Sequence, residues 1–204
     1  MGVFRHGPAM GLAAGLVGLV TGCASSSPSG HQPPSPGPAS ARPAAGTSAG
    51  PAPAACRTGS LEVRVDATQA GAATGSTYYP IDFTNTSASA CDLNGFPGVT
   101  VVTARGATGR QLGAAAQQDP DFDPVAVRIV PGGHAHAWLQ VGAAGSYPAA
   151  ACEPTAASWV RVSAPGSPAA GYARVELTAC TAAGAEQLTV LPVRAGLGSR
   201  GSTP

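Results

Sequence analysis

The sequence predicts an all-β protein, an antiparallel Ig-like β-sandwich of about eight short strands. Three observations lead to this prediction. Apolar and polar residues alternate with a period of two through most of the central part of the chain, turn-rich stretches separate these segments, and no long amphipathic helix interrupts them. We place this domain at residues 56–194, which is long enough to enclose one hydrophobic core.

The individual strands follow from the alternation. Residues 61–66 and 79–84 alternate most cleanly, so we expect two half-buried strands there. The other expected strands are 99–103, 125–130, 135–141, 159–164, 173–179 and 188–193. Stretches rich in Gly, Pro and Asn separate them at 94–98, 105–106, 131–133 and 164–166. This spacing favours antiparallel hairpins over a βαβ arrangement.

Four cysteines lie in the expected domain, at Cys56, Cys91, Cys152 and Cys180. An even number of cysteines in an exported chain indicates two disulfides, for which three connectivities are open. We expect the local pairs, Cys56 with Cys91 and Cys152 with Cys180, each closing a loop of about 30 residues. The alternative is a metal site, but zinc ligands come in close pairs such as C-x₂-C and these spacings offer none.

The N-terminal part of the chain predicts export and a lipid anchor. Its apolar run at residues 11–20 is too short to span a bilayer and leads into Val20-Thr21-Gly22-Cys23, a pattern typical of a bacterial lipobox. We therefore predict a lipoprotein signal peptide at 1–22 and lipidation of Cys23. This predicts a location at the cell surface, on the outer face of the cytoplasmic membrane. The alternative is an ordinary secretory signal in which Cys23 has no role.

Two segments outside the domain have the composition of disordered chain. Residues 23–55 are rich in Ser, Pro, Ala and Gly and contain no acidic residue and no large aliphatic side chain, so they cannot bury enough apolar surface to fold. We expect a disordered linker there. The tail at 195–204 is again rich in Gly and Ser, and we expect it to be disordered as well.

Several spaced motifs resemble those of a known family. They are TYYPIDFTNTS at 77–87, CDLNGFPGV at 91–99, PGG at 131–133, YPAAAC at 147–152 and TAC at 178–180. In these motifs residues 56–194 resemble a family of actinobacterial lipoproteins, the domain-of-unknown-function family number 4232. The resemblance implies a secreted or lipid-anchored β-sandwich with paired cysteines. It implies no activity, substrate, cofactor or catalytic residue.

A candidate binding patch lies on the strand expected at 135–141. Strand alternation places four polar and aromatic side chains on one face, which we expect to be exposed to solvent. They are His134, His136, Trp138 and Gln140. Trp is a common anchor of recognition surfaces, so this face predicts a site for a carbohydrate or a protein. The alternatives are ordinary exposed polar positions with Trp138 packed against a neighbouring loop, and a His-x-His metal pair, for which the sequence offers no third ligand.

The only acidic cluster comprises Asp119, Asp121 and Asp123. The EF-hand pattern requires Gly and Glu where this chain has Pro124 and Val130, so the loop fails that test. We expect a solvated connection, with a weak cation site of another kind as the alternative.

Composition and motifs also limit the functions to consider. The formal net charge is +1 and all eleven basic residues are Arg, without a basic stripe, so we expect no nucleic-acid partner. No motif for a nucleophile elbow, a metalloprotease or a phosphate loop occurs, so we expect a non-enzymatic protein without a cofactor. The leading hypothesis is a lipid-anchored surface module that binds an envelope polysaccharide or protein. The alternatives are an accessory subunit of a membrane complex and an uncharacterised cell-wall enzyme.

Overall fold

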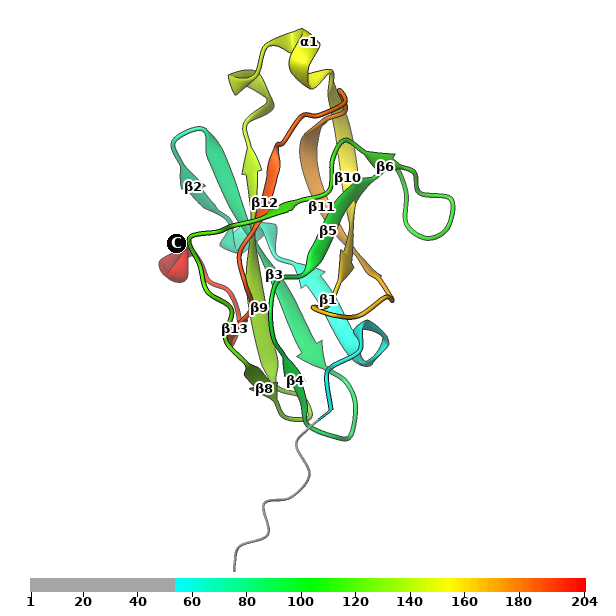
Figure 1. Ribbon diagram of the computed structural model, residues 1–204, viewed down its shortest axis with the longest axis vertical. Coiled ribbons are helices and arrows are strands. Elements are labelled where there is room, and N and C mark those ends of the chain that lie inside the picture. The colour runs from blue at the N-terminus through cyan, green and yellow to red at the C-terminus, as the bar shows by residue number, and fades with distance from the viewer. Residues whose placement is uncertain (1–53) are drawn as a thin grey trace, which may run out of the picture. The chain divides into compact units, whose positions relative to one another are not determined.

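The computed structural model describes residues 54–204, and the predicted signal peptide, Cys23 and nearly all of the predicted linker lie outside the described residues. Figure 1 shows an elongated all-β domain. Its first sheet contains β1 (Leu61–Val65), β2 (Gly71–Ala73), β3 (Ser76–Asn85), β7 (Gln117–Gln118), β9 (His134–Gly142), β12 (Leu188–Val190) and β13 (Arg194–Ala195). The second contains β5 (Gly98–Val102), β6 (Gln111–Leu112), β10 (Pro154–Ser163) and β11 (Gly171–Cys180), and β4 (Cys91–Leu93) pairs with β8 (Val127–Ile129).

The strands of the first sheet follow the order β1-β3-β9-β12-β7, with β2 paired to β3 and β13 paired to β9. All of these pairs are antiparallel except β12 with β7. The second sheet has the order β11-β10-β5-β6. In the described residues, helical structure is limited to α1 (Ala149–Cys152) and to short 3-10 turns, η1 (Thr58–Ser60), η2 (Ala67–Gln69), η3 (Ala144–Ser146) and η4 (Arg200–Ser202).

The core lies between the two main sheets. Ile81 and Phe83 of β3 and Leu139 of β9 are fully buried on the inner face of the first sheet. Val160 and Val162 of β10 meet them from the second sheet and are also fully buried. Each such side chain contributes about 1.5–3 kcal/mol of transfer free energy. The predicted all-β sandwich is therefore confirmed.

All eight expected strands overlap observed ones, although their limits differ. The largest difference is in β10, which begins at Pro154 and not at Trp159. Its register against β11 shifts between Ala157 and Trp159, so the alternation in the sequence is broken at that bulge. The short strands β2, β4, β6, β7 and β13 contain two or three residues each, too few to show a period.

Both expected disulfides are present. Cys56 pairs with Cys91 and closes a separation of 35 residues, and Cys152 pairs with Cys180 across 28 residues. The first joins the start of the described chain to β4, and the second joins α1 to the end of β11. Figure 1 shows α1 at one end of the domain and β4 with β8 at the other. The two bonds therefore fix opposite ends of the sandwich.

The prediction of a disordered tail at 195–204 is wrong. After β13, residues 196–204, which we call the strap, lie on the outer face of the first sheet and include η4. The N–H of Gly196 donates to the backbone oxygen of His134 (3.0 Å), and the N–H of Gly198 donates to Asp82 Oδ1 (2.9 Å). Composition did not reveal this order because the strap is held mainly through its backbone, which every sequence shares. The linker prediction also extends slightly too far, since Ala55 forms a bridge with Asp92.

Candidate functional site

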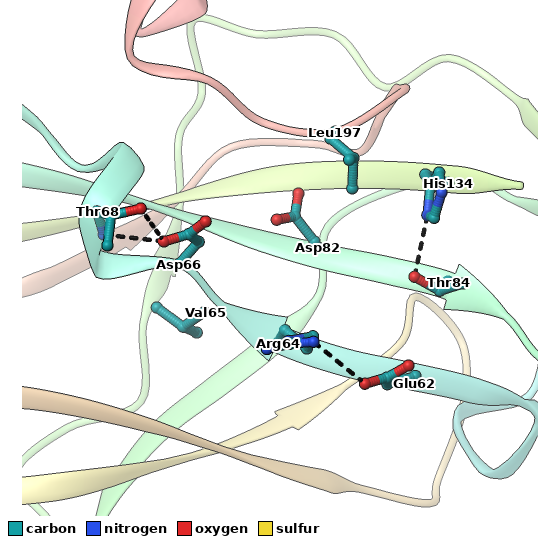
Figure 2. A pocket seen from close by; sticks show the side chains of 9 residues that line it. All are labelled: Glu62, Arg64, Val65, Asp66, Thr68, Asp82, Thr84, His134 and Leu197. Atoms are coloured by element: carbon teal, nitrogen blue, oxygen red, sulfur yellow. Dashed lines mark hydrogen bonds and ion pairs between the residues drawn. The ribbon is translucent and has the colours of Figure 1, made fainter.

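A polar hollow of about 610 Å³ lies on the outer face of the first sheet, between β1, β3, β9 and the strap (Figure 2). Three strands, the η2 turn and the strap each contribute side chains to its wall. They are Glu62, Arg64, Val65, Asp66, Thr68, Asp82, Thr84, His134 and Leu197. We refer to this site as the polar hollow.

Strand register brings these side chains together. Glu62 lies opposite Thr84 and Arg64 lies opposite Asp82 in the β1–β3 pair. Thr84 in turn lies opposite His134 in the β3–β9 pair. Because residues directly opposite each other in antiparallel strands have neighbouring side chains on one face, residues distant in the sequence meet in one place.

The hollow is predominantly acidic. Its wall carries the three carboxylates of Glu62, Asp66 and Asp82, against one guanidinium, that of Arg64. Arg64 Nη1 lies 3.8 Å from Glu62 Oε1, and both side chains are largely exposed. An exposed ion pair of this length contributes little to stability and leaves both groups free to contact a ligand.

The two aspartates of the hollow have opposite pKa shifts. Burial raises the pKa of Asp82, which is only 9% exposed, and the hydrogen bond from the Gly198 N–H partly counteracts that effect. The pKa of Asp66 is lowered by hydrogen bonds from Thr68, whose hydroxyl lies 2.6 Å and whose N–H lies 2.9 Å from Oδ1. Asp66 thereby caps η2 and keeps its charge at the rim of the hollow.

His134 forms the third side of the hollow. Its Nδ1 lies 3.0 Å from Thr84 Oγ1, within hydrogen-bond distance (Figure 2). A hydroxyl beside an imidazole is the geometry of a nucleophile and its base, which requires a third group to orient the imidazole. Within residues 54–204 no carboxylate is hydrogen-bonded to His134, so this third group is missing there. Thr84 and His134 are in contact because they are paired across β3 and β9.

The four side chains of the predicted patch on β9 differ in their exposure to solvent. His134 is exposed in the polar hollow, whereas His136 is 7% exposed and Trp138 is 3% exposed. Gln140 is half-buried, and its Nε2 donates to Ser76 Oγ (3.1 Å). The four side chains share one face as predicted, but the expectation that this face is open to solvent is wrong for His136 and Trp138. The strap and its neighbours cover both.

Trp138 lies in a second, mainly apolar hollow of about 290 Å³. Its ring meets the His136 ring edge to face, with centroids 6.0 Å apart and an interplanar angle of 84°. The remaining lining residues come from the 119–125 loop, from the segment after β12 and from the strap. They are Phe122, Leu191, Pro192, Arg194, Ser202 and Pro204. We refer to this site as the Trp138 hollow.

The acidic loop at Asp119 to Asp123 forms an exposed turn. The N–H of Asp121 donates to Asp119 Oδ1 (3.0 Å), and the backbone oxygen of Asp123 accepts from Arg194 Nη2 (3.1 Å). In the part of the chain that the structure describes, no three His, Cys, Asp or Glu side chains are grouped to hold a metal ion. Neither this loop nor the His134–His136 pair therefore has a ligand set there. The same residues include no helix long and apolar enough to cross a membrane.

Sequence reasoning missed most of the polar hollow. The alternation at 61–66 already placed Glu62, Arg64 and Asp66 on the outward face, and the same pattern placed Asp82 and Thr84 outward in β3. The missing information was which strands pair. Without the β1–β3–β9 order, the outward residues of three strands cannot be assigned to one site.

The fold and the paired cysteines define an all-β sandwich domain with two disulfides and a polar hollow on one sheet. Residues 56–194 match the family model described as "Domain of unknown function (DUF4232)", and the chain belongs to this family. Neither the curated proteins nor the solved structures include a match to this chain.

Proposed function

We propose that this protein is a non-enzymatic, lipid-anchored module of the cell surface that binds an envelope polysaccharide or protein through the polar hollow. The observation that carries the proposal is the hollow itself, in which side chains from three strands and the strap surround one solvent-open space. Its volume lies in the range of ordinary ligand sites, about 300–1,000 Å³.

The chemistry of the wall supports a ligand rich in hydroxyl, amide or amino groups. Carboxylates such as Glu62 and Asp66 accept hydrogen bonds from such groups, and the Arg64 guanidinium donates them. Leu197, which is 55% exposed, adds an apolar contact at the rim. A site with several polar groups fixed on strands orients its ligand with little loss of side-chain freedom.

Two features of the chain support presentation at a surface. The lipobox ending at Cys23 supports the anchor, and the Pro-rich composition of residues 24–53 supports a spacer. The described chain begins at Ala54, beside the Cys56–Cys91 disulfide at the β4 end of the domain (Figure 1). An anchor attached at that end leaves the outer face of the first sheet accessible.

Retention of purified envelope fractions on the immobilised protein tests the proposal. Glu62→Gln removes one carboxylate from the hollow, and Glu176→Gln is the matched control because Glu176 is also exposed but lies on the second sheet. We expect Glu62→Gln to weaken retention of one cell-wall glycan or envelope protein by about tenfold, the equivalent of one hydrogen bond to a charged group. The control should retain wild-type binding. Equal retention by both variants would exclude the hollow as the binding site.

A further inference from the structure

The strap crosses the outer face of β3 and β9 through backbone contacts. The N–H of Gly196 donates to the backbone oxygen of His134, and Nδ1 of His136 donates to the backbone oxygen of Gly196 (both 3.0 Å). The N–H of Gly198 donates to Asp82 Oδ1 at 2.9 Å. All three contacts use the backbone of the strap and side chains or backbone of the sheet. The sheet therefore contacts the backbone of the strap here, at the turn where Gly196 has a φ of 83° and in the irregular segment that follows it.

Arg200 attaches the far part of the strap to the η2 turn. Its Nη2 donates to the backbone oxygen of Thr68 (2.8 Å), and its Nε donates to that of Ala70 (3.2 Å). Its own N–H donates to Gln69 Oε1 (3.3 Å). One arginine is thus the main side-chain contact of this part of the strap.

The strap covers apolar and titratable groups but buries little of its own apolar surface. Its one large aliphatic side chain, Leu197, is 55% exposed. Beneath or beside it lie Asp82, His136 and Trp138, each less than one-tenth exposed. The hydrogen bond from Gly198 to Asp82 is buried, whereas those of Arg200 are exposed. Segments with few buried apolar contacts and exposed hydrogen bonds open locally, so we expect the strap to open from its Arg200 end.

We propose that the strap occupies a peptide-binding groove of this protein, and that a partner protein binds by placing a peptide of its own along the same path. The contacts of the strap give the chemistry of the partner peptide. It offers a backbone N–H to Asp82 and a backbone carbonyl to His136. It carries a glycine where Gly198 crosses the sheet, because a Cβ there would overlap the Cβ of Pro80. It also carries an arginine for the carbonyls of the η2 turn.

Displacement of the strap joins the two hollows. Leu197 borders the polar hollow, while Ser202 and Pro204 border the Trp138 hollow. Asp82 of the first hollow and His136 of the second lie directly opposite each other in the β3–β9 pair, so the surface beneath the strap is continuous. This inference rests on the proposed function, since it specifies a peptide segment of a partner protein as the ligand of this face.

The first test compares Gly198→Ala with Gly201→Ala in the full chain. A Cβ at Gly198 would overlap Pro80 and lie 3.3 Å from Cδ2 of His136, whereas a Cβ at Gly201 would meet nothing within 4 Å. We expect trypsin to cleave after Arg200 about tenfold faster in Gly198→Ala, the change that follows from losing one hydrogen bond to a charged group. Gly201→Ala should be cleaved at the wild-type rate. Equal cleavage of all three chains would overturn the proposal.

The second test supplies the strap in trans. A chain ending at Ala195 in a Trp159→Phe background leaves Trp138 as the only tryptophan and is titrated with the synthetic peptide of residues 196–204. We expect saturable binding by Trp138 fluorescence, about tenfold weaker binding of the Arg200→Ala peptide, and unchanged binding of the Gly201→Ala peptide. The uncut chain should bind the peptide poorly because its groove is filled.

A shortened chain that keeps its circular dichroism but binds no peptide would contradict the proposal. If shortening unfolds the domain, the same peptide is titrated into the full-length Gly198→Ala chain in the Trp159→Phe background. Saturable binding there supports the peptide groove, and no binding contradicts it. Failure here is distinct from failure of the proposed function, because the peptide titration involves no envelope component. If envelope fractions are retained in a way that depends on Glu62, but the strap peptide does not bind, the polar hollow remains a binding site and the peptide groove is excluded.

Discussion

Gln187 joins the two sheets through its side-chain amide. Its Oε1 accepts from the N–H of Cys180 (2.7 Å), and its Nε2 donates to the backbone oxygens of Thr178 (2.7 Å) and Gly142 (2.9 Å). Thr178 and Cys180 belong to β11, whereas Gly142 ends β9. Gln187 is 6% exposed, and its bond with Cys180 is buried, whereas those with Thr178 and Gly142 are partly buried. One buried amide therefore connects a strand of each sheet.

We expect Gln187→Ala to lower the free energy of unfolding by about 3 kcal/mol, because it removes three hydrogen bonds and leaves the buried N–H of Cys180 without its partner. Urea denaturation measures this change. Gln140→Ala is the control, since Gln140 is half-buried and makes one side-chain hydrogen bond. Its effect should stay below about 1 kcal/mol. Equal losses for both variants would show that Gln187 does not join the sheets in solution.

Asp82 should make stability depend on pH. Because burial raises its pKa, the folded state binds a proton at this carboxyl more tightly than the unfolded state. Its contribution to the free energy of unfolding is therefore fully present below the ordinary pKa of 3.8 and is lost as the pH rises through the raised value. Asp82→Asn removes the titration and keeps an oxygen that accepts from Gly198.

We expect the stability of Asp82→Asn relative to wild type to be higher at about pH 7 than at about pH 3, measured by urea denaturation at each pH. Asp66→Asn provides a comparison of opposite sign, since the pKa of Asp66 is lowered and its contribution is lost as the pH falls. A difference between Asp82→Asn and wild type that does not change with pH would contradict the burial of an ionisable Asp82.

At the scale of elements, the longer regular strands were predictable and the irregular ones were not. The limits of β1 were predicted to within one residue because its burial alternates along the strand. The prediction for β3 found its centre, but the strand runs from Ser76 to Asn85 and its outer face is partly buried as well. β10 carries a bulge at Ala157 that reverses the alternation, so its first half was missed. The strap was missed for a different reason, since a Gly/Ser-rich segment has no periodicity and its order depends on partners in β3, β9 and η2.

The candidate site was predictable only in part. The sequence placed His134, His136, Trp138 and Gln140 on one face of a strand, and the structure agrees with that assignment. The strap covers His136 through Gly196, which lies 60 residues further along the chain. Trp138 is covered by the strap together with Phe122, Leu191 and Pro192. The polar hollow depends on pairing between β1, β3 and β9, which no local pattern encodes.

The two disulfides fix the ends of the sandwich, and their loss should be measurable separately. Cys56→Ser with Cys91→Ser opens a loop of 35 residues, and Cys152→Ser with Cys180→Ser opens one of 28 residues. Chain entropy predicts a loss of about 3–4 kcal/mol in each case. Thermal unfolding of the two double variants gives the separate losses, and a reductant acting on the wild type gives the combined loss. A melting temperature that reduction leaves unchanged would mean that the bonds do not stabilise the folded domain.

For the whole molecule, the proposed layout is a lipid at Cys23, a spacer and a sandwich whose outer face binds a partner. We expect Cys23→Ser to move the protein from the membrane fraction to the medium, since the proposed anchor depends on that sulfur alone. Immunoblots of both fractions measure the change. Ser35→Cys in the Cys23→Ser background is the control, because a cysteine displaced from the lipobox should not restore attachment. Retention of Cys23→Ser in membranes would contradict the lipid anchor.

The outer face of the first sheet is the proposed binding face in the cell. The most direct measurement is photocrosslinking in intact cells from a crosslinking side chain placed at Glu62 in one chain and at Glu176 in another, two exposed glutamates on different sheets. We predict a discrete envelope adduct from position 62 and none from position 176. Identical adducts from both positions, or an adduct from position 176 alone, would show that the outer face of the first sheet is not the binding face.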